Sequence, residues 1–233
     1  MYTAKEVSRK LKEKSSPERA RETLRFFKTG PGQYGEGDKF IGTSVPDIRE
    51  ISKNAKDIPF IELQKLVKSP VHEERLAGFI ICTLKFLKAK KSEYEQERVV
   101  RFFIRHRKFL NNWDIIDVTV PKVLGEYFLK RERTFLYDLI RSKSLWDRRI
   151  AIMSTFTFLK QGDFEDTLNF CEQLLSDKED LIHKASGWML REVGKRDKER
   201  LLIFLRKHSP KMPRTMLRYS LEKLSPLEKS EFF

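Results

Sequence analysis

Apolar residues along the chain recur at intervals of three and four, the spacing that places side chains on one face of an α-helix. The segments that carry this pattern run for about ten to eighteen residues and are separated by short polar stretches. Several begin with a helix-capping residue, as at Ser16 (followed by Pro17), Ser44, Ser92 and Ser144. No segment shows the alternation of a β-strand. The pattern therefore predicts an all-α protein.

Two further boundaries are predicted from serine–proline pairs. Ser69-Pro70 repeats the order of Ser16-Pro17, so it is expected to open the strongly apolar helix that contains Leu76 to Leu87. We expect residues 226–233, which follow Ser225, to form a frayed tail.

The segment from Asn112 to Lys130 combines three unusual features. Asn112 predicts an N-cap, and Trp113 and Asp117 are four residues apart, so their side chains share one face of a helix. Pro121 lies within the same apolar pattern and cannot donate a hydrogen bond to the carbonyl of Asp117. We therefore expect the helix to kink or restart next to Asp117. Taken alone, this spacing indicates a core tryptophan and a surface acid.

A weak internal repeat is visible in three segments in which a basic residue precedes small and apolar residues. These segments are Glu74–Gly78, Arg148–Ile152 and His183–Gly187. Arg75 and Arg149 are 74 residues apart, or two units of 37, and Lys184 follows Arg149 by 35 residues. Two-helix units of this length are typical of HEAT, armadillo and TPR proteins. We therefore predict one domain over residues 1–233, an α-solenoid of HEAT-like antiparallel helix pairs with a concave basic face.

Equivalent positions of successive units line the concave face of such a solenoid. The residues expected near this surface are Arg75, Trp113, Arg149 and Trp188. Trp188 also shares a helix face with Lys184 and Arg191, at spacings of four and three residues. Basic residues interleaved with aromatic residues along a groove are typical of nucleic-acid binding.

Residues 30–42 form a glycine-rich loop, and its first three glycines at Gly30, Gly32 and Gly35 match G-x-G-x-x-G. The dinucleotide-binding fingerprint needs a strand before it and a helix directly after it, whereas a helical pattern precedes this loop. We therefore predict an irregular functional loop in which glycines adopt positive φ. Tyr34 and Lys39 of this loop are candidates for contact with a ligand.

The balance of charge indicates the kind of partner. The chain has 233 residues, with 48 Lys and Arg against 34 Asp and Glu, so its formal net charge is +14. This excess indicates a polyanionic partner, most simply nucleic acid, and the alternative is a basic surface without a specific partner. No apolar run approaches a membrane span, and the first residues are too charged for a signal peptide. We therefore expect no membrane contact and a cytoplasmic protein, associated with the nucleoid when bound to DNA.

The residues that most often bind metals show no metal-binding pattern. Cys82 and Cys171 lie in separate apolar segments and form no C-x-x-C. The four histidines are scattered without an H-x-x-x-H spacing, so they are expected to be ordinary surface or cap residues. We predict no metal and no cofactor.

Three motifs occur together: Trp113-Asp114-Ile115-Ile116-Asp117 followed by Pro121, Trp146-Asp147-Arg148-Arg149-Ile150-Ala151-Ile152, and Lys184-Ala185-Ser186-Gly187-Trp188-Met189-Leu190-Arg191-Glu192. In this order and spacing the chain resembles the AlkD family of DNA alkylation-repair glycosylases, over most of its length. The resemblance implies an α-solenoid of HEAT-like repeats that excises cationic N3- or N7-alkylated purines from duplex DNA without flipping the damaged base. The glycine-rich loop departs from the better-known members.

The resemblance implies a role for each matching position. Asp117 matches the catalytic aspartate, and Trp113 and Trp188 match two tryptophans that flank the sugar and backbone of the lesion. Arg149 matches an arginine of the same cleft. The further candidates for DNA contact are Arg148, Lys184, Arg191, Arg75, Tyr34 and Lys39. The partner would be double-stranded DNA that contains alkylated purines, bound by a monomer.

The chemistry of such a substrate needs few protein groups. An alkylated purine that already carries positive charge leaves without protonation, and positive charge develops on the deoxyribose. The carboxylate of Asp117 can stabilise that charge and orient water, while tryptophan faces add cation–π attraction. No lysine nucleophile is required, which predicts a monofunctional DNA glycosylase. The alternative is a catalytically inactive HEAT-repeat DNA-binding or scaffold protein of the same fold, with Trp113 and Trp188 packed between helices.

Overall fold

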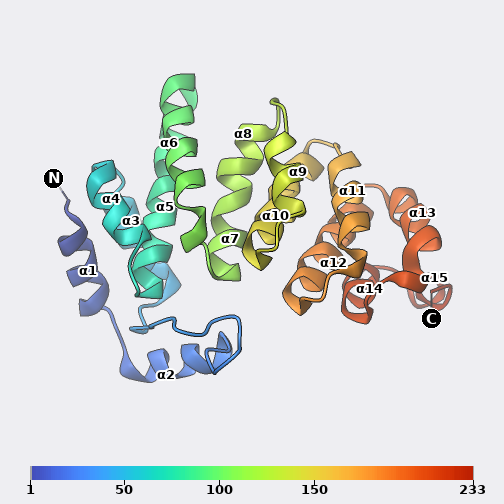
Figure 1. The fold of residues 1–233 in the computed structure, drawn as a ribbon, viewed down its shortest axis with the longest axis horizontal. Helices are drawn as coiled ribbons and strands as arrows, with labels where there is room; N and C mark the ends of the chain where they lie inside the picture. Colours follow the sequence, from blue (N-terminus) through green and yellow to red (C-terminus); the bar gives the residue numbers. More distant parts are fainter. Residues whose placement is uncertain (1, 233) are drawn as a thin grey trace. The chain divides into compact units, whose positions relative to one another are not determined.

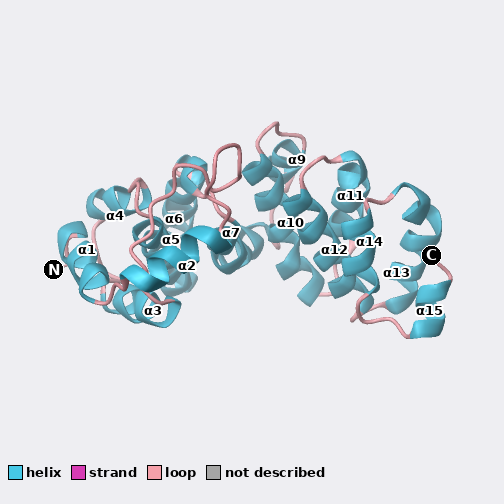
Figure 2. Ribbon diagram, turned by 90° about the horizontal axis from the view of Figure 1, so that it is seen from below, coloured by secondary structure: helices cyan, strands magenta, loops and turns pink. Residues whose placement is uncertain are grey.

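A computed structural model describes residues 2–232, and these residues form an all-α helical repeat fold (Figure 1). The only extended pairing among them is an isolated bridge between Lys39 and Val71, and Figure 2 shows helices joined by loops throughout. The prediction of an all-α protein is confirmed. Within this part of the chain no helix is long and apolar enough to cross a membrane. The chain divides into two compact units, residues 1–119 and 120–233.

The first unit is built around one long central helix. Its helices are α1 (Ala4–Glu13), α2 (Pro17–Phe26), α3 (Val45–Asn54), α4 (Phe60–Val67), α5 (His72–Lys88), η1 (Ala89–Lys91), α6 (Glu93–Arg105), η2 (Arg107–Phe109) and α7 (Trp113–Val120). Helix α5 packs against α1, α3, α4 and α6. Because it has neighbours on several sides, its consecutive residues from Leu76 to Phe79 are all buried.

The second unit has two such central helices. Its elements are η3 (Pro121–Gly125), α8 (Glu126–Phe128), α9 (Thr134–Ile140), α10 (Leu145–Lys160), α11 (Glu165–Gln173), η4 (Leu174–Ser176), α12 (Asp180–Gly194), α13 (Lys198–His208), η5 (Ser209–Lys211), α14 (Arg214–Leu221) and α15 (Pro226–Ser230). Helix α10 packs against η3, α9, α11 and α12, and α12 also contacts α13 and α14. The residues from Arg149 to Thr155 in α10 are accordingly buried without interruption.

The predicted capping serines begin four of these helices. The side chains of Ser16, Ser44, Ser92 and Ser144 each accept a hydrogen bond from the backbone N–H three residues later. Each bond gives a partner to one of the N–H groups that a helix start leaves without an intrahelical acceptor. These local signals therefore predict the helix starts correctly.

One predicted boundary was wrong. Ser69-Pro70 does not open α5, which begins at His72 after an extended Val71. The reason is tertiary: the Pro70 carbonyl accepts a hydrogen bond from the N–H of Lys39, which holds this segment in the bridge to the glycine-rich loop. The expected frayed tail contains α15, whose start is fixed by a capping box between Ser225 and Glu228.

The helical path changes its pitch at Pro121, as the missing N–H led us to expect. The next turn, η3, is a π-helix that runs into α8. Gly125 ends η3, and a Cβ on it would lie 2.7 Å from the carbonyl oxygen of Ser154 in α10. The hydroxyl of Thr157 donates to the Pro121 carbonyl at 2.7 Å. The widened turn is thus held closely against α10.

The glycine-rich loop follows α2, which ends at Phe26. Gly32, Gly37 and Gly42 have positive φ, as predicted for an irregular loop. Gly42 also lies so close to the start of α2 that a Cβ would be 2.1 Å from the Ser16 carbonyl oxygen. A larger residue cannot replace it without moving the backbone.

Candidate active site

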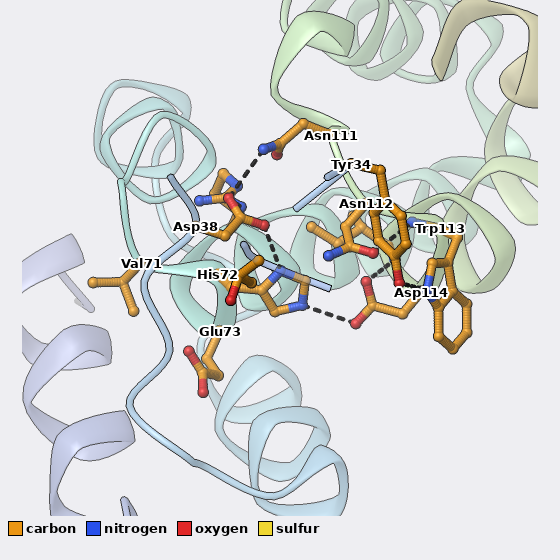
Figure 3. A network of polar contacts seen from close by, with 12 residues as sticks. Tyr34, Asp38, Val71, His72, Glu73, Asn111, Asn112, Trp113 and Asp114 are labelled. Atoms are coloured by element: carbon orange, nitrogen blue, oxygen red, sulfur yellow. Dashed lines mark hydrogen bonds and ion pairs between the residues drawn. The ribbon is translucent and has the colours of Figure 1, made fainter. Parts of the chain in front are cut away.

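Trp113 opens α7 and is half-buried against aromatic neighbours. Its ring centroid lies 5.3 Å from that of Phe27 and 5.8 Å from that of Phe26. The indole N–H donates to the hydroxyl of Tyr34 at 3.2 Å, so the glycine-rich loop touches α7 here (Figure 3). Because both the ring and its N–H have partners, the indole is held in one orientation.

The two aspartates of the first motif have different environments. Asp114 accepts a hydrogen bond from Nε2 of His72 at 2.8 Å, and its other oxygen accepts from the backbone N–H of Ile115 at 2.8 Å. Asp114 therefore stabilises the first turn of α7, where the helix dipole also favours a carboxylate. Asp117 lies one turn further on, half-buried and on the same helix face as Trp113.

His72 connects α5 to α7 and to the glycine-rich loop, and Figure 3 shows it between two carboxylates. It is only 2% exposed, and its Nδ1 lies 3.6 Å from Oδ2 of Asp38. Burial by itself would lower the pKa of His72, but the carboxylates of Asp114 and Asp38 outweigh burial and raise this pKa to about 9. Burial by itself would raise the pKa of Asp38. The contact with His72, the charge of Arg75 and the hydrogen bond from Asn111 outweigh burial and lower this pKa.

The prediction that the histidines are ordinary surface or cap residues was wrong for His72, whereas His106 is the C-cap of α6 and His208 is the N-cap of η5. His72, His106 and His208 are buried, and only His183 is half-buried. His72 contacts Asp38 and Asp114, which are distant in the chain, and hydrophobic periodicity does not report such contacts.

The predicted DNA contact at Arg75 is corrected by the structure. Its guanidinium is buried, forms an ion pair with Asp38 at 2.6 Å and donates to the Ser69 carbonyl at 3.0 Å. A phosphate cannot reach a guanidinium enclosed in this way, so Arg75 stabilises the interior of the first unit. The other two candidates near the first motif are less buried than Arg75. Tyr34 is half-buried beside Trp113, and the side chain of Lys39 is exposed.

Arg148 and Arg149 of the second unit both hold backbone groups. Arg148 pairs with Asp177 at 2.6 Å and donates to the carbonyls of Ser142 and Lys143. Arg149 is 4% exposed, and one of its Nη groups donates to the Leu181 carbonyl at 2.5 Å. The two arginines therefore tie the start of α10 to the segments around it, and a guanidinium held in this way has a fixed direction.

Trp188, Lys184 and Arg191 share one side of α12 as predicted, and all three are half-buried. The Trp188 ring packs at 5.9 Å from Phe156, and its N–H donates to Glu192 at 3.3 Å. Lys184 pairs with Asp180 at 2.7 Å, and Arg191 pairs with Glu222. This side of α12 thus presents two cations beside a tryptophan.

Three residues of this site were missed by the sequence reasoning. Phe26 and Phe27 pack on Trp113, and His72 fixes the first turn of α7. The two adjacent phenylalanines shortly before the glycine-rich loop were an available signal in the sequence, and the structure leaves Phe26 65% exposed. Nothing in the sequence marked His72.

The fold and these residues define a class: a basic all-α helical-repeat protein with a tryptophan and a carboxylate on one face of a helix. The family model of the DNA alkylation repair enzymes matches residues 7–224. The chain therefore belongs to the DNA alkylation repair enzyme family, its substrate is DNA, and the resemblance seen in the three motifs is confirmed at this level.

One solved structure is similar over nearly the whole chain. It is described as a predicted DNA alkylation repair enzyme from Enterococcus faecalis, with a TM-score of 0.68 and 16% sequence identity. The match covers 91% of this chain and 98% of that chain, and at this identity it shows the fold alone. No curated protein matches the sequence significantly.

Proposed function

We propose that the protein is a monofunctional DNA glycosylase that hydrolyses the N-glycosidic bond of cationic N3- or N7-alkylated purines in duplex DNA. The observation that carries this proposal is the placement of Asp117, a half-buried carboxylate one helical turn from the anchored indole of Trp113. Membership of the DNA alkylation repair enzyme family supports it. Asp114 of the same motif has a structural task, because its two oxygens bond His72 and the helix backbone.

The proposed reaction begins from a base that is already positively charged. Such a purine departs without a general acid, and positive charge builds up on the deoxyribose as the bond breaks. The Asp117 carboxylate stabilises this charge and orients the water that attacks the sugar carbon. The proton of this water passes to Asp117 or to solvent. The damaged base stays within the duplex, as the family resemblance implies.

Trp113 and Trp188 are proposed to border the sugar and its neighbouring backbone. Their ring faces attract a cationic sugar and exclude water from it. Trp113 is well suited to this role, because its contacts with Phe27 and Tyr34 fix the ring before DNA binds. Preorganised groups lower the barrier more than mobile ones.

The proposed phosphate contacts come from the second unit. Arg149 is as buried as Arg75, so its proposed role is to hold the start of α12 in place through the Leu181 carbonyl and not to bind a phosphate directly. Lys184 and Arg191, on the same side of α12 as Trp188, bind the adjoining backbone. Tyr34 and Lys39 contribute from the glycine-rich loop, and the exposed ammonium of Lys39 is the stronger candidate for direct contact. The protein acts on DNA as a monomer in this proposal.

Release of free base from defined duplexes tests the proposal. Duplexes that contain one N7-methylguanine or one N3-methyladenine should lose the base and retain an intact abasic strand, because no lysine nucleophile cleaves the backbone. Chromatography of the released base and a separate alkali step to reveal abasic sites would measure both events. Tight duplex binding with no base release from either lesion would instead favour the inactive DNA-binding alternative.

Lys184→Ala should weaken duplex binding and reduce the slope of log K against log salt by about 0.9, the value for one lost phosphate contact. Lys207→Ala is the matched control, because it removes the same charge from an exposed ion pair on α13. Fluorescence anisotropy with a labelled duplex at several salt concentrations would measure both slopes. Equal slopes for the two variants would remove Lys184 from the DNA contacts.

A further inference from the structure

The glycine-rich loop is fastened to the start of α5 by backbone and carboxylate contacts. The N–H of His72 donates to the Lys39 carbonyl at 2.8 Å, in the isolated bridge between Lys39 and Val71. The Glu73 carboxylate accepts from the N–H groups of Ile41 and Gly42, the latter at 2.7 Å. Figure 3 shows Val71, His72 and Glu73 along this segment. The end of the loop is therefore fixed relative to α5.

The buried carboxylate of Asp38 also anchors the loop. Its Oδ1 accepts from Arg75 at 2.6 Å and from the side-chain amide of Asn111 at 3.0 Å, and its Oδ2 faces His72 at 3.6 Å. Asn111 stands two residues before Trp113 at the start of α7. The carboxylate of Asp38 therefore bonds both α5, through Arg75, and Asn111, which precedes α7.

His72 makes the second connection to α7. Its Nε2 donates to Asp114 at 2.8 Å, and Asp114 in turn accepts from the N–H of Ile115. Both contacts lie in the first turn of α7, where Trp113 also lies. The line Asp38–His72–Asp114 therefore joins the loop to the turn that carries the indole.

An aromatic cluster follows the same path. Phe27 lies 5.2 Å from the His72 ring and 5.3 Å from each of the Phe40 and Trp113 rings, measured between centroids. Phe40 stacks on His72 at 4.6 Å. A displacement of the His72 imidazole would therefore be transmitted to Trp113 through Phe27 as well as through Asp114.

We propose that His72 is a positioning residue for base excision: by bridging Asp38 and Asp114 it holds the first turn of α7 against the glycine-rich loop, so that Trp113 meets Tyr34 in the orientation that DNA requires. This inference rests on the proposed glycosylase function. It assigns to the loop a task that is unrelated to nucleotide binding, because the loop supports one side of the indole. His72 touches neither DNA nor the reacting atoms.

The charge of His72 determines how strong the bridge is. The groups that face it are Asp38 from the loop, Asp114 from α7 and Arg75 from its own helix. With a pKa of about 9, the ring is an imidazolium at neutral pH and attracts both carboxylates. The folded pKa is higher than the ordinary value of 6.5, so this contribution is complete below pH 6.5 and is lost as the pH rises through about 9. The bridge should weaken over the same range.

The first test uses Trp113 as the only tryptophan, in a protein with Trp146→Phe and Trp188→Phe. Its emission should change between pH 6.5 and 9.5 with a midpoint near 9, and His72→Gln should abolish this transition. His106→Gln is the control, because His106 is also buried and its ring bonds the Phe102 carbonyl of α6. A transition that survives in His72→Gln would overturn the proposal. This readout needs no DNA, so it remains informative even if the protein releases no base.

The second test measures chemistry in the protein with all three tryptophans. At pH 7, His72→Gln should slow single-turnover release of N7-methylguanine by roughly 10- to 100-fold, the cost of a misplaced active-site group, with duplex affinity little changed. A purely structural role predicts a lower melting temperature with an unchanged rate per folded molecule, and that result would overturn the proposal. If His72→Gln does not fold, Asp114→Asn replaces it in the fluorescence test, and its midpoint should fall below that of the parent. An unchanged midpoint would again be decisive against the bridge.

Discussion

Replacing Asp117 by asparagine should slow base release about 10²- to 10³-fold, or about 2.7–4 kcal/mol of barrier, which is the cost of removing one preorganised electrostatic group. The amide keeps the shape of the carboxylate but loses the charge that stabilises the cationic sugar. Duplex affinity should stay the same or rise, because a negative charge beside the phosphates is removed. Single-turnover release of N7-methylguanine, duplex affinity and melting temperature would be measured on the same preparations.

Asp138→Asn is the matched control for this experiment, since it makes the same change in charge on the exposed surface of α9. It should leave base release unchanged. If Asp117 has only a structural role, its asparagine variant will melt earlier and release base at the parental rate per folded molecule. A stable, DNA-binding Asp117→Asn protein with full activity would exclude Asp117 from the mechanism.

Replacing Arg75 by methionine should lower the free energy of unfolding by about 3–5 kcal/mol, the usual cost of breaking a buried ion pair. The side chains of Arg75 and Asp38 are each 4% exposed, so the variant would leave a carboxylate buried without its closest cation. Asn111 and His72 remain beside Asp38, which favours the lower end of this range. Urea unfolding followed by circular dichroism would measure the change in midpoint.

Two variants separate this effect from a general loss of arginine. Arg101→Met removes an exposed arginine that pairs with Glu97 within α6, and it should change stability by less than about 0.5 kcal/mol. Adding Asp38→Asn to Arg75→Met should recover part of the loss, because the unpaired charge is then absent. The slope of DNA affinity against salt should be the same for Arg75→Met and the parent. A smaller slope together with unchanged stability would restore Arg75 as a DNA contact.

Local patterns predicted the helices well because the forces behind them act over a few residues. Ser44 and Ser144 cap their helices through the N–H three residues later, which is a contact within one turn. Pro121 changes the helix pitch because it lacks an N–H, a property of the residue itself. Ser69-Pro70 looked like the same kind of signal, yet there the bridge to Lys39 decided the conformation.

The candidate site was predictable to the extent that its residues share a helix. Trp113 and Asp117 on α7, and Lys184, Trp188 and Arg191 on α12, follow from spacings of three and four residues. The residues that contact Trp113 could not be predicted from helical spacing. Tyr34 is 79 residues from Trp113 in the sequence, and only the folded loop brings them together.

The sequence by itself determined the helical class, most helix starts and the family, because short-range hydrogen bonding, apolar periodicity and motif spacing are properties of the chain order. Only the tertiary structure decided which polar residues face inward. Arg75 and Arg149 occupy equivalent positions of a basic pattern, and both are buried: Arg75 pairs with Asp38, 37 residues away, and Arg149 donates to the Leu181 carbonyl. The positive charge of His72 is likewise stabilised by Asp38 and Asp114, which belong to two other segments. A buried charge is stable only where its counter-charges converge, and that convergence is a property of the fold.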